Sequence, residues 1–116
     1  MSQEVVLDDT LKLRNKNCFE AAWELLDEHM PLGTRLVHGR PQYRGLETPD
    51  ADGRYAHAWV EYDGHVYDFS HGLSTVMDVD LYYAIGNIEP HEVRKYSYDE
   101  AIIQLLGRKH WGPWNS

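Results

Sequence analysis

The spacing of hydrophobic positions near the N-terminus predicts a helix over residues 18–30. Asn17 is a favourable N-cap, and Glu20 lies three residues on, as in a capping box. Pro31 is expected to end the helix. The side chains that recur at helical spacing form one apolar face: Phe19, Ala22, Trp23, Leu26 and Met30.

The middle of the chain predicts β-structure. Residues 34–39 (TRLVHG) suggest a short strand, and a polar loop follows with a short strand around residues 42–44. Two arms, residues 55–62 and 65–70, flank Asp63-Gly64. This dipeptide strongly favours a two-residue hairpin turn. We therefore expect an antiparallel hairpin beside at least one further strand.

The last third of the chain predicts a short helix, a strand and a longer helix. Residues 71–80 show no periodicity and are expected to be irregular, and one or two helical turns follow over residues 80–85. Residues 92–96 suggest a strand, and the S-x-x-E spacing that begins at Ser97 is a capping box for the final helix. We expect that helix to end at Gly107. Two tryptophans of the tail are expected to pack back onto the body: Trp111 and Trp114.

Length, composition and charge limit the class of protein. A chain of 116 residues is expected to form one domain, residues 1–116, and the element order predicts an α+β fold in which an N-terminal helix packs on a small antiparallel sheet with a C-terminal helix. The formal charge of −8 argues against nucleic acid or membrane as a partner. The acidic start lacks a signal-peptide pattern, and one cysteine cannot form an internal disulfide, so we expect a cytoplasmic protein. No cofactor is expected, and the oligomeric state stays open.

The hairpin turn decides which side chains share a face of the sheet. A two-residue turn pairs Tyr62 with His65, and His57, Trp59 and Asp68 then lie on one face. The Cβ atoms of His57 and Asp68 would be roughly 5–8 Å apart, within reach of a hydrogen bond. A three-residue turn would place these two side chains on opposite faces.

The only cysteine completes a possible thiol site. A thiol in the first turn of a helix lies near the positive end of the helix dipole, which favours the thiolate. A neighbouring histidine can take the thiol proton, and a carboxylate can orient that histidine. Cys18, His57 and Asp68 are therefore the catalytic candidates. Three further side chains are candidates to line the pocket: His38, Tyr55 and Trp59.

The segments NCFEAAWELL and YAHAWVEYDGHVYDFS resemble the transglutaminase-like branch of the papain-like cysteine protease superfamily. Members carry a cysteine at the N-terminus of a helix packed on an antiparallel sheet, a His-Ala-Trp-Val-like strand, and an aspartate on the next strand. The leader peptidases of lasso-peptide biosynthesis are similar in this hairpin. The resemblance covers roughly residues 14–70. It implies a papain-like/transglutaminase-like core with Cys18 as nucleophile, His57 as general base and acid, and Asp68 as the orienting residue, acting on a peptide or protein substrate.

The sequence departs from this pattern at the oxyanion hole. Papain-type enzymes place a glutamine six residues before the cysteine, where this chain has Lys12, and transglutaminases place a tryptophan upstream, which is absent here. The backbone N–H of Cys18 is a candidate for one oxyanion donor. The side chains of Asn15 and Asn17 are candidates for the other, whereas the flexible ammonium of Lys12 would be a poorly preorganised donor.

Two other classes of function stay open. The chain contains enough nitrogen, sulfur and oxygen donors for zinc, but none of them has a tight ligand spacing, so no metal site is assigned. A non-catalytic protein-binding or inhibitor domain could also retain this fold. Within the thiol class, peptidase, amidase, deamidase and transglutaminase-like chemistry share the same thioester steps, and the sequence does not separate them. The possible zinc donors are Cys18, His38, His57, His65, Asp68 and His71.

Overall fold

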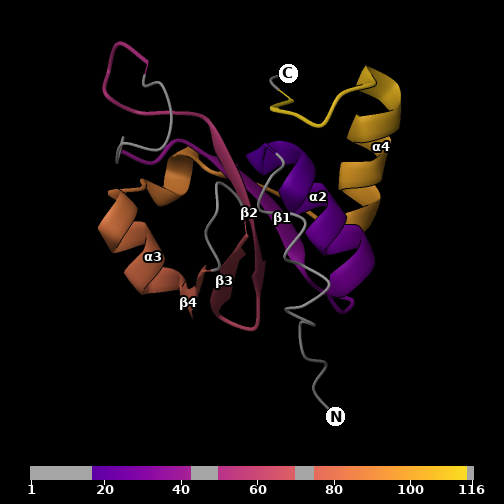
Figure 1. Ribbon diagram of the computed structural model, residues 1–116, viewed down its shortest axis with the longest axis horizontal. Helices are drawn as coiled ribbons and strands as arrows, with labels where there is room; N and C mark the ends of the chain where they lie inside the picture. The colour runs from indigo at the N-terminus through magenta and orange to yellow at the C-terminus, as the bar shows by residue number, and fades with distance from the viewer. Residues whose placement is uncertain (1–16, 43–49, 70–74, 115–116) are drawn as a thin grey trace.

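Helix α2 packs on a five-stranded antiparallel sheet, and helix α4 follows near the C-terminus (Figure 1). The computed structural model describes residues 17–42, 50–69 and 75–114. The predicted α+β fold is confirmed at this level. The elements are α2 (Cys18–His29), β1 (Arg35–Gly39), β2 (His57–Tyr62), β3 (His65–Asp68), β4 (Thr75–Asp78), α3 (Val79–Gly86), the 3-10 turn η2 (Pro90–Glu92), β5 (Arg94–Tyr96) and α4 (Tyr98–Arg108).

The sheet has the strand order β4-β3-β2-β1-β5, so β2 lies at its centre. Helices α2 and α4 cover one face and α3 covers the other (Figure 1). Alternate residues of β2 therefore enter two different cores. Ala58 and Val60 pack under α2, whereas Trp59 packs with Val66 of β3 on the α3 side. Within the described residues, every helix is too short or too polar to cross a bilayer.

The start of α2 is determined by its cap. The side chain of Asn17 accepts a hydrogen bond from the backbone N–H of Glu20 at 2.9 Å, which confirms the predicted N-cap. Cys18 is consequently the first helical residue. The helix ends at His29, and Met30 is already extended ahead of Pro31.

The hairpin turn between β2 and β3 is tight, as predicted. Tyr62 pairs with His65, and Asp63 and Gly64 both have left-handed backbone angles, with φ of 51° and 76°. This is the backbone of a two-residue hairpin turn with positive φ at both central positions. The register places His57 and Asp68 on the α3 side of the sheet, together with Trp59.

The prediction that residues 71–80 are irregular is wrong for their second half. Residues 75–78 form the edge strand β4, which pairs with β3 and places Met77 opposite Val66. Val76 points outward and is 49% exposed, so the apolar side chains of this strand do not mark its buried face. Backbone pairing with β3 therefore defines β4. Residues 71–74 lie outside the described residues.

Other predicted boundaries hold with small shifts. Gln42 forms only an isolated bridge with Arg54, and the rest of the predicted strand at 42–44 lies outside the described residues. The predicted strand at 92–96 is shortened to Arg94–Tyr96, because residues 90–92 form a 3-10 turn. The capping box of α4 is present, with Ser97 and Glu100 bonded reciprocally, and the helix ends at Arg108. The tail packs back as predicted, with two side chains on the α2-side core: Trp111 and Trp114.

Gly39 of β1 faces the core beneath Trp59, and an added side chain there is expected to destabilise the fold. A Cβ atom at Gly39 would lie 2.6 Å from Cη2 of Trp59 and 3.1 Å from Cγ1 of Val93. Gly39→Ala should therefore lower the free energy of unfolding by about 1–3 kcal/mol, as overpacking typically does. Denaturant titration measures the change. The control is Gly107→Ala on α4, where nothing lies within 4 Å of the added Cβ and a gain of about 0.5–1 kcal/mol is expected.

Candidate active site

The imidazole of His57 and the carboxylate of Asp68 are in direct contact. Nε2 of His57 lies 2.7 Å from Oδ2 of Asp68. The two side chains are 4% and 7% exposed, so the pair is nearly withdrawn from water. The contact predicted from the hairpin register is present. A buried carboxylate in this position holds the imidazole in one orientation and fixes Nε2 as the protonated nitrogen.

Cys18 meets this pair from the first turn of α2. The thiol lies close enough to the His57 side chain to influence its pKa, and Cys18, Trp59 and Asp68 surround one closely packed spot that leaves no room for a water molecule. Because Asp68 holds Nε2, Nδ1 is the ring nitrogen through which His57 can exchange a proton with sulfur. The β2–β3 ladder ends at the pair Val60 and Tyr67, and the thiol lies just beyond that end. The three predicted catalytic side chains are therefore brought together.

The surroundings favour the protonated form of His57. Burial lowers the pKa of His57, but the negative charge and hydrogen bond of Asp68, together with the interaction with Cys18, outweigh burial and raise this pKa to about 10. At neutral pH the imidazolium is consequently the stable form. A cationic ring beside the sulfur in turn stabilises a thiolate.

Tyr82 of α3 is a part of the site that the sequence analysis missed. Its hydroxyl donates a hydrogen bond to Oδ2 of Asp68 at 2.8 Å, the same oxygen that contacts His57. Burial, followed by the charge of Asp68, raises the pKa of Tyr82 well above its usual value, so the hydroxyl keeps its proton. No spacing rule relates a residue of a later helix to Asp68, and the only local signal was the paired tyrosines in a short apolar segment.

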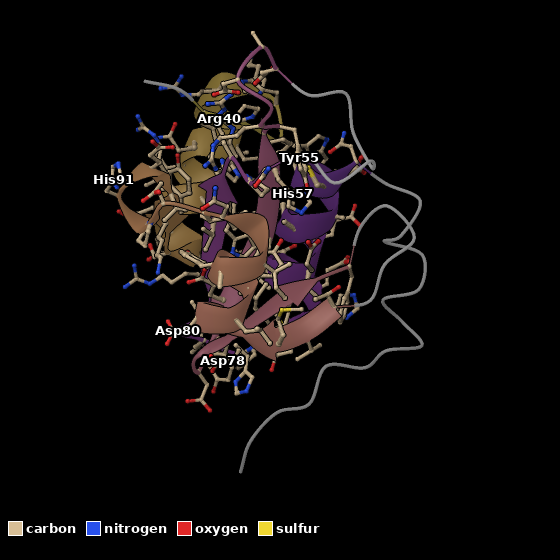
Figure 2. The ribbon with its side chains drawn as sticks, turned by 90° about the vertical axis from the view of Figure 1, so that its left-hand side faces the viewer. Arg40, Tyr55, His57, Asp78, Asp80 and His91 are labelled. Atoms are coloured by element: carbon tan, nitrogen blue, oxygen red, sulfur yellow. The ribbon has the colours of Figure 1, made fainter. Side chains whose placement is uncertain are left out.

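Two of the predicted pocket-lining side chains flank the imidazole. The ring centroid of Tyr55 lies 5.3 Å from that of His57, and the centroid of Trp59 lies 5.8 Å away on the other side along the strand. Figure 2 shows Tyr55 and His57 close together near one end of the sheet. Both aromatic side chains are buried, so they shield the ion pair from water.

His38 lies on the opposite face of the sheet from His57. It pairs across β1 and β2 with Ala58, on the α2 side, and its ring packs against Phe19 and Trp114 at centroid distances of 4.9 Å each. Burial lowers the pKa of His38 to about 4, so this ring is neutral. It lines a pocket of about 210 Å³ that adjoins the triad only through chain neighbours, since Phe19 follows Cys18 and Ala56 precedes His57.

The oxyanion candidates are only partly described. Cys18 is the first residue of α2, and an N–H in the first turn has no acceptor within its helix. The carboxamide oxygen of Asn17 caps the helix, which leaves its NH₂ group as the part that can donate. Asn15 and Lys12 lie outside the described residues.

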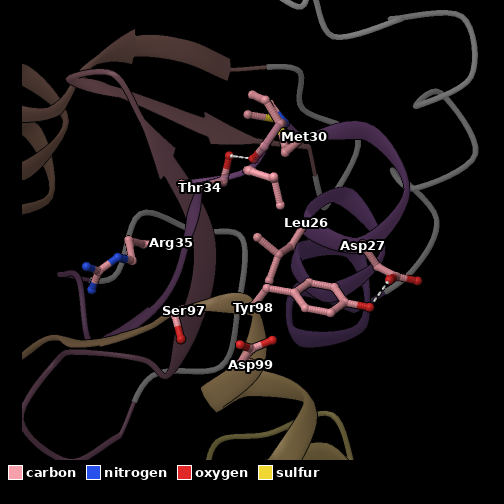
Figure 3. Close-up of a pocket in the computed structure, with 11 residues that line it drawn as sticks. Leu26, Asp27, Met30, Thr34, Arg35, Ser97, Tyr98 and Asp99 are labelled. Carbon is pink, nitrogen blue, oxygen red and sulfur yellow. Dashed lines mark hydrogen bonds between the residues drawn. The ribbon is translucent and has the colours of Figure 1, made fainter.

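Other sites are weaker. Across residues 17–42, 50–69 and 75–114, no three His, Cys, Asp or Glu side chains are grouped so as to hold a metal ion. A larger hollow of about 520 Å³ lies at the other end of α2, between that end and the start of α4 (Figure 3). Its Tyr98 and Asp27 bond to each other at 2.7 Å, and no residue of the triad lines it.

The comparisons with known proteins were made for the whole chain. No protein-family model, curated protein or solved structure matches it. The chemistry of the side chains at the site is therefore what indicates a function for this chain.

Proposed function

We propose that this chain is a cysteine-dependent acyl-transfer enzyme that cleaves amides through a Cys18-His57-Asp68 triad, on a papain-like/transglutaminase-like fold. The observation that carries the proposal is the convergence of the three side chains. Nε2 of His57 lies 2.7 Å from Oδ2 of Asp68, and the His57 side chain also interacts with Cys18. A helix terminus and an imidazolium beside one sulfur are the two features that activate catalytic cysteines.

The proposed reaction proceeds through a thioester. The Cys18 thiolate attacks the carbonyl carbon of an amide, and the imidazolium of His57 gives its Nδ1 proton to the leaving nitrogen as the C–N bond breaks. His57, now neutral, removes a proton from water, and the resulting hydroxide equivalent attacks the thioester. The C–S bond then breaks, which releases a carboxylic acid and restores the thiolate and the imidazolium.

Asp68 and the oxyanion donors complete the proposed mechanism. The carboxylate of Asp68 stabilises the imidazolium in each half of the cycle and does not itself take the proton. The first-turn N–H of Cys18 and the carboxamide of Asn17 are the available donors to the negative carbonyl oxygen. Donors of this kind contribute about 2.7–4 kcal/mol each when they are preorganised.

The substrate class that we propose is a peptide or protein amide. Cys18 is only 3% exposed and the closely packed spot around it leaves no room for a water molecule, so neighbouring side chains must move before an acyl group can reach the sulfur. If an amine instead of water resolves the thioester, the same steps give transamidation. A binding or inhibitor domain with this fold would retain the triad geometry without turnover.

The proposal is tested with p-nitrophenyl acetate, a small activated acyl donor. The expected result is a burst of p-nitrophenolate equal to the protein concentration, together with a mass gain of one acetyl group on Cys18. Hydroxylamine should remove that group, because it cleaves thioesters. Cys18→Ser with the same ester is the control and should show no burst. An absence of acetylation on the wild-type thiol, at any pH between 6 and 9, would reject acyl transfer and favour the binding domain.

A further inference from the structure

Tyr82 approaches Asp68 from α3, a helix that the proposed triad does not otherwise use. We infer that Tyr82 is a positioning residue of the thiol site, which acts by holding the Asp68 carboxylate in place behind His57. This inference rests on the proposed function, since it concerns the reactivity of the same sulfur. Tyr82 is a fourth side chain of the site. It also brings in α3 as a third structural element, beside α2 and the hairpin.

The contact geometry gives Tyr82 direct control over the orientation of Asp68. Oδ2 of Asp68 lies 2.7 Å from Nε2 of His57 and accepts the Tyr82 hydroxyl at 2.8 Å. Two donors at one carboxylate oxygen restrict rotation of the carboxyl group, and through it the rotation of the imidazole. Tyr82 is itself held by its ring contact with Trp59, at a centroid distance of 5.1 Å.

The role of Tyr82 is greatest when His57 is neutral. After His57 has given its proton to the leaving group, the buried Asp68 carboxylate no longer faces a cation. The Tyr82 hydroxyl then remains as a donor that stabilises the buried anion. The titratable groups packed around Asp68 in the described part of the chain are His57 of β2, Tyr82 of α3, Cys18 of α2 and Tyr55, which precedes β2.

The neighbouring residue Tyr83 provides a matched control. Its hydroxyl donates to Oε2 of Glu61 at 2.6 Å, so it too bonds a buried carboxylate from the same helix. The Glu61 carboxylate also accepts the indole N–H of Trp59 and an ion pair from Lys95 at 3.0 Å. These three partners of Glu61 are not members of the triad. Tyr82→Phe and Tyr83→Phe thus each remove one tyrosine hydrogen bond to a buried carboxylate, but only the first touches the site.

The test measures the rate at which iodoacetamide alkylates Cys18 between pH 4 and 9, in wild type and in both variants. We expect Tyr82→Phe to lower the rate at pH 6 by about 10-fold, the effect of losing one hydrogen bond to a charged group. We also expect its acid limb to move to higher pH, because a carboxylate with fewer donors ionises less readily. Tyr83→Phe should stay within about twofold of wild type, although both variants should lose similar thermal stability.

Each outcome decides between the alternatives. Equal alkylation profiles for Tyr82→Phe and Tyr83→Phe would overturn the inference. The proposed function would still stand in that case if His57→Gln strongly lowered the alkylation rate. Should alkylation not depend on His57 at all, the proposed function itself fails. If Tyr82→Phe does not fold, Tyr82→Gln replaces it, because a carboxamide retains a donor. Tyr82→Leu, which removes the donor, is then measured beside it: faster alkylation in Tyr82→Gln than in Tyr82→Leu supports the inference, and equal rates contradict it.

Discussion

Replacing His57 by glutamine is expected to lower the rate at which iodoacetamide alkylates Cys18 at pH 6 by about 10–100-fold. An ordinary thiol, with a pKa near 8.5, is only about 0.3% ionised at that pH. Burial lowers the pKa of His57, but Asp68 outweighs burial and raises this pKa to about 10, so the ring places a positive charge beside the sulfur at the same pH. A cation in this position favours the reactive thiolate. The alkylation rate should fall by a smaller factor than the fraction of thiolate does, because a thiolate of low basicity is also a weaker nucleophile.

The control for this prediction is His65→Gln. His65 lies on the second arm of the same hairpin, but it is exposed and its Nδ1 faces the backbone oxygen of Asp63 at 2.9 Å. This variant should alkylate like wild type at every pH. Equal rates for His57→Gln and wild type at pH 6 would show that the imidazole does not activate the sulfur. The rate at pH 9.5 should differ much less among the three proteins, because even an ordinary thiol is largely ionised there.

In the variant Cys18→Ser, whose hydroxyl does not titrate in this range, the stability of the fold is expected to fall as the pH rises above about 6.5. The pKa of His57 is raised in the folded state relative to its ordinary value of 6.5, so the folded protein holds this proton more tightly than the unfolded chain. The stabilisation is therefore complete below about pH 6.5 and is lost as the pH passes through the folded-state value. Between these limits the free energy of unfolding should decrease by up to about 1.4 kcal/mol per pH unit.

Urea titrations of Cys18→Ser at pH 6, 7, 8 and 9 measure this slope. In wild type, the proton that the thiol loses when the thiolate forms on folding would offset the proton held by His57 up to about pH 8.5. Asp68→Asn should abolish most of the slope, because the neutral amide no longer raises the pKa of His57. At pH 6 the same variant should be less stable than wild type by about 3–5 kcal/mol, the usual cost of removing one partner from a buried ion pair. A stability of Cys18→Ser that is flat from pH 6 to 9 would mean that His57 is neutral in the folded protein.

The sequence was sufficient for the elements whose signals are local. The N-cap at Asn17 and the capping box at Ser97 lie within one helical turn of the groups that they satisfy, and both helices begin where these residues predict. Asp63-Gly64 determines the hairpin in the same way, because few dipeptides tolerate two left-handed backbone positions in succession. The turn then determines the register, and the register places His57 and Asp68 on one face.

No local sequence signal predicted the edge strand β4. Its apolar Val76 points to solvent, so residues 75–78 carry no alternation that a strand rule can detect. The strand exists because the backbone of β3 offers unpaired donors and acceptors on that side, and this is a property of the folded sheet.

His38 shows that the sequence alone could not decide which predicted side chains lie beside His57. Its place on β1 was predicted, but the face of the sheet to which it points follows from pairing with Ala58. That pairing turns the ring toward Phe19 and Trp114, on the side away from His57.

By itself, the sequence determined the two capped helices, the tight hairpin, and the shared face of the imidazole and the carboxylate, because each depends on residues only a few positions apart. Only the tertiary structure decided that the Cys18 thiol meets this pair and that the Tyr82 hydroxyl bonds the same oxygen of Asp68. The physical reason is that packing of α2 and α3 on opposite faces of one sheet joins groups distant in the chain, and no local spacing specifies such contacts.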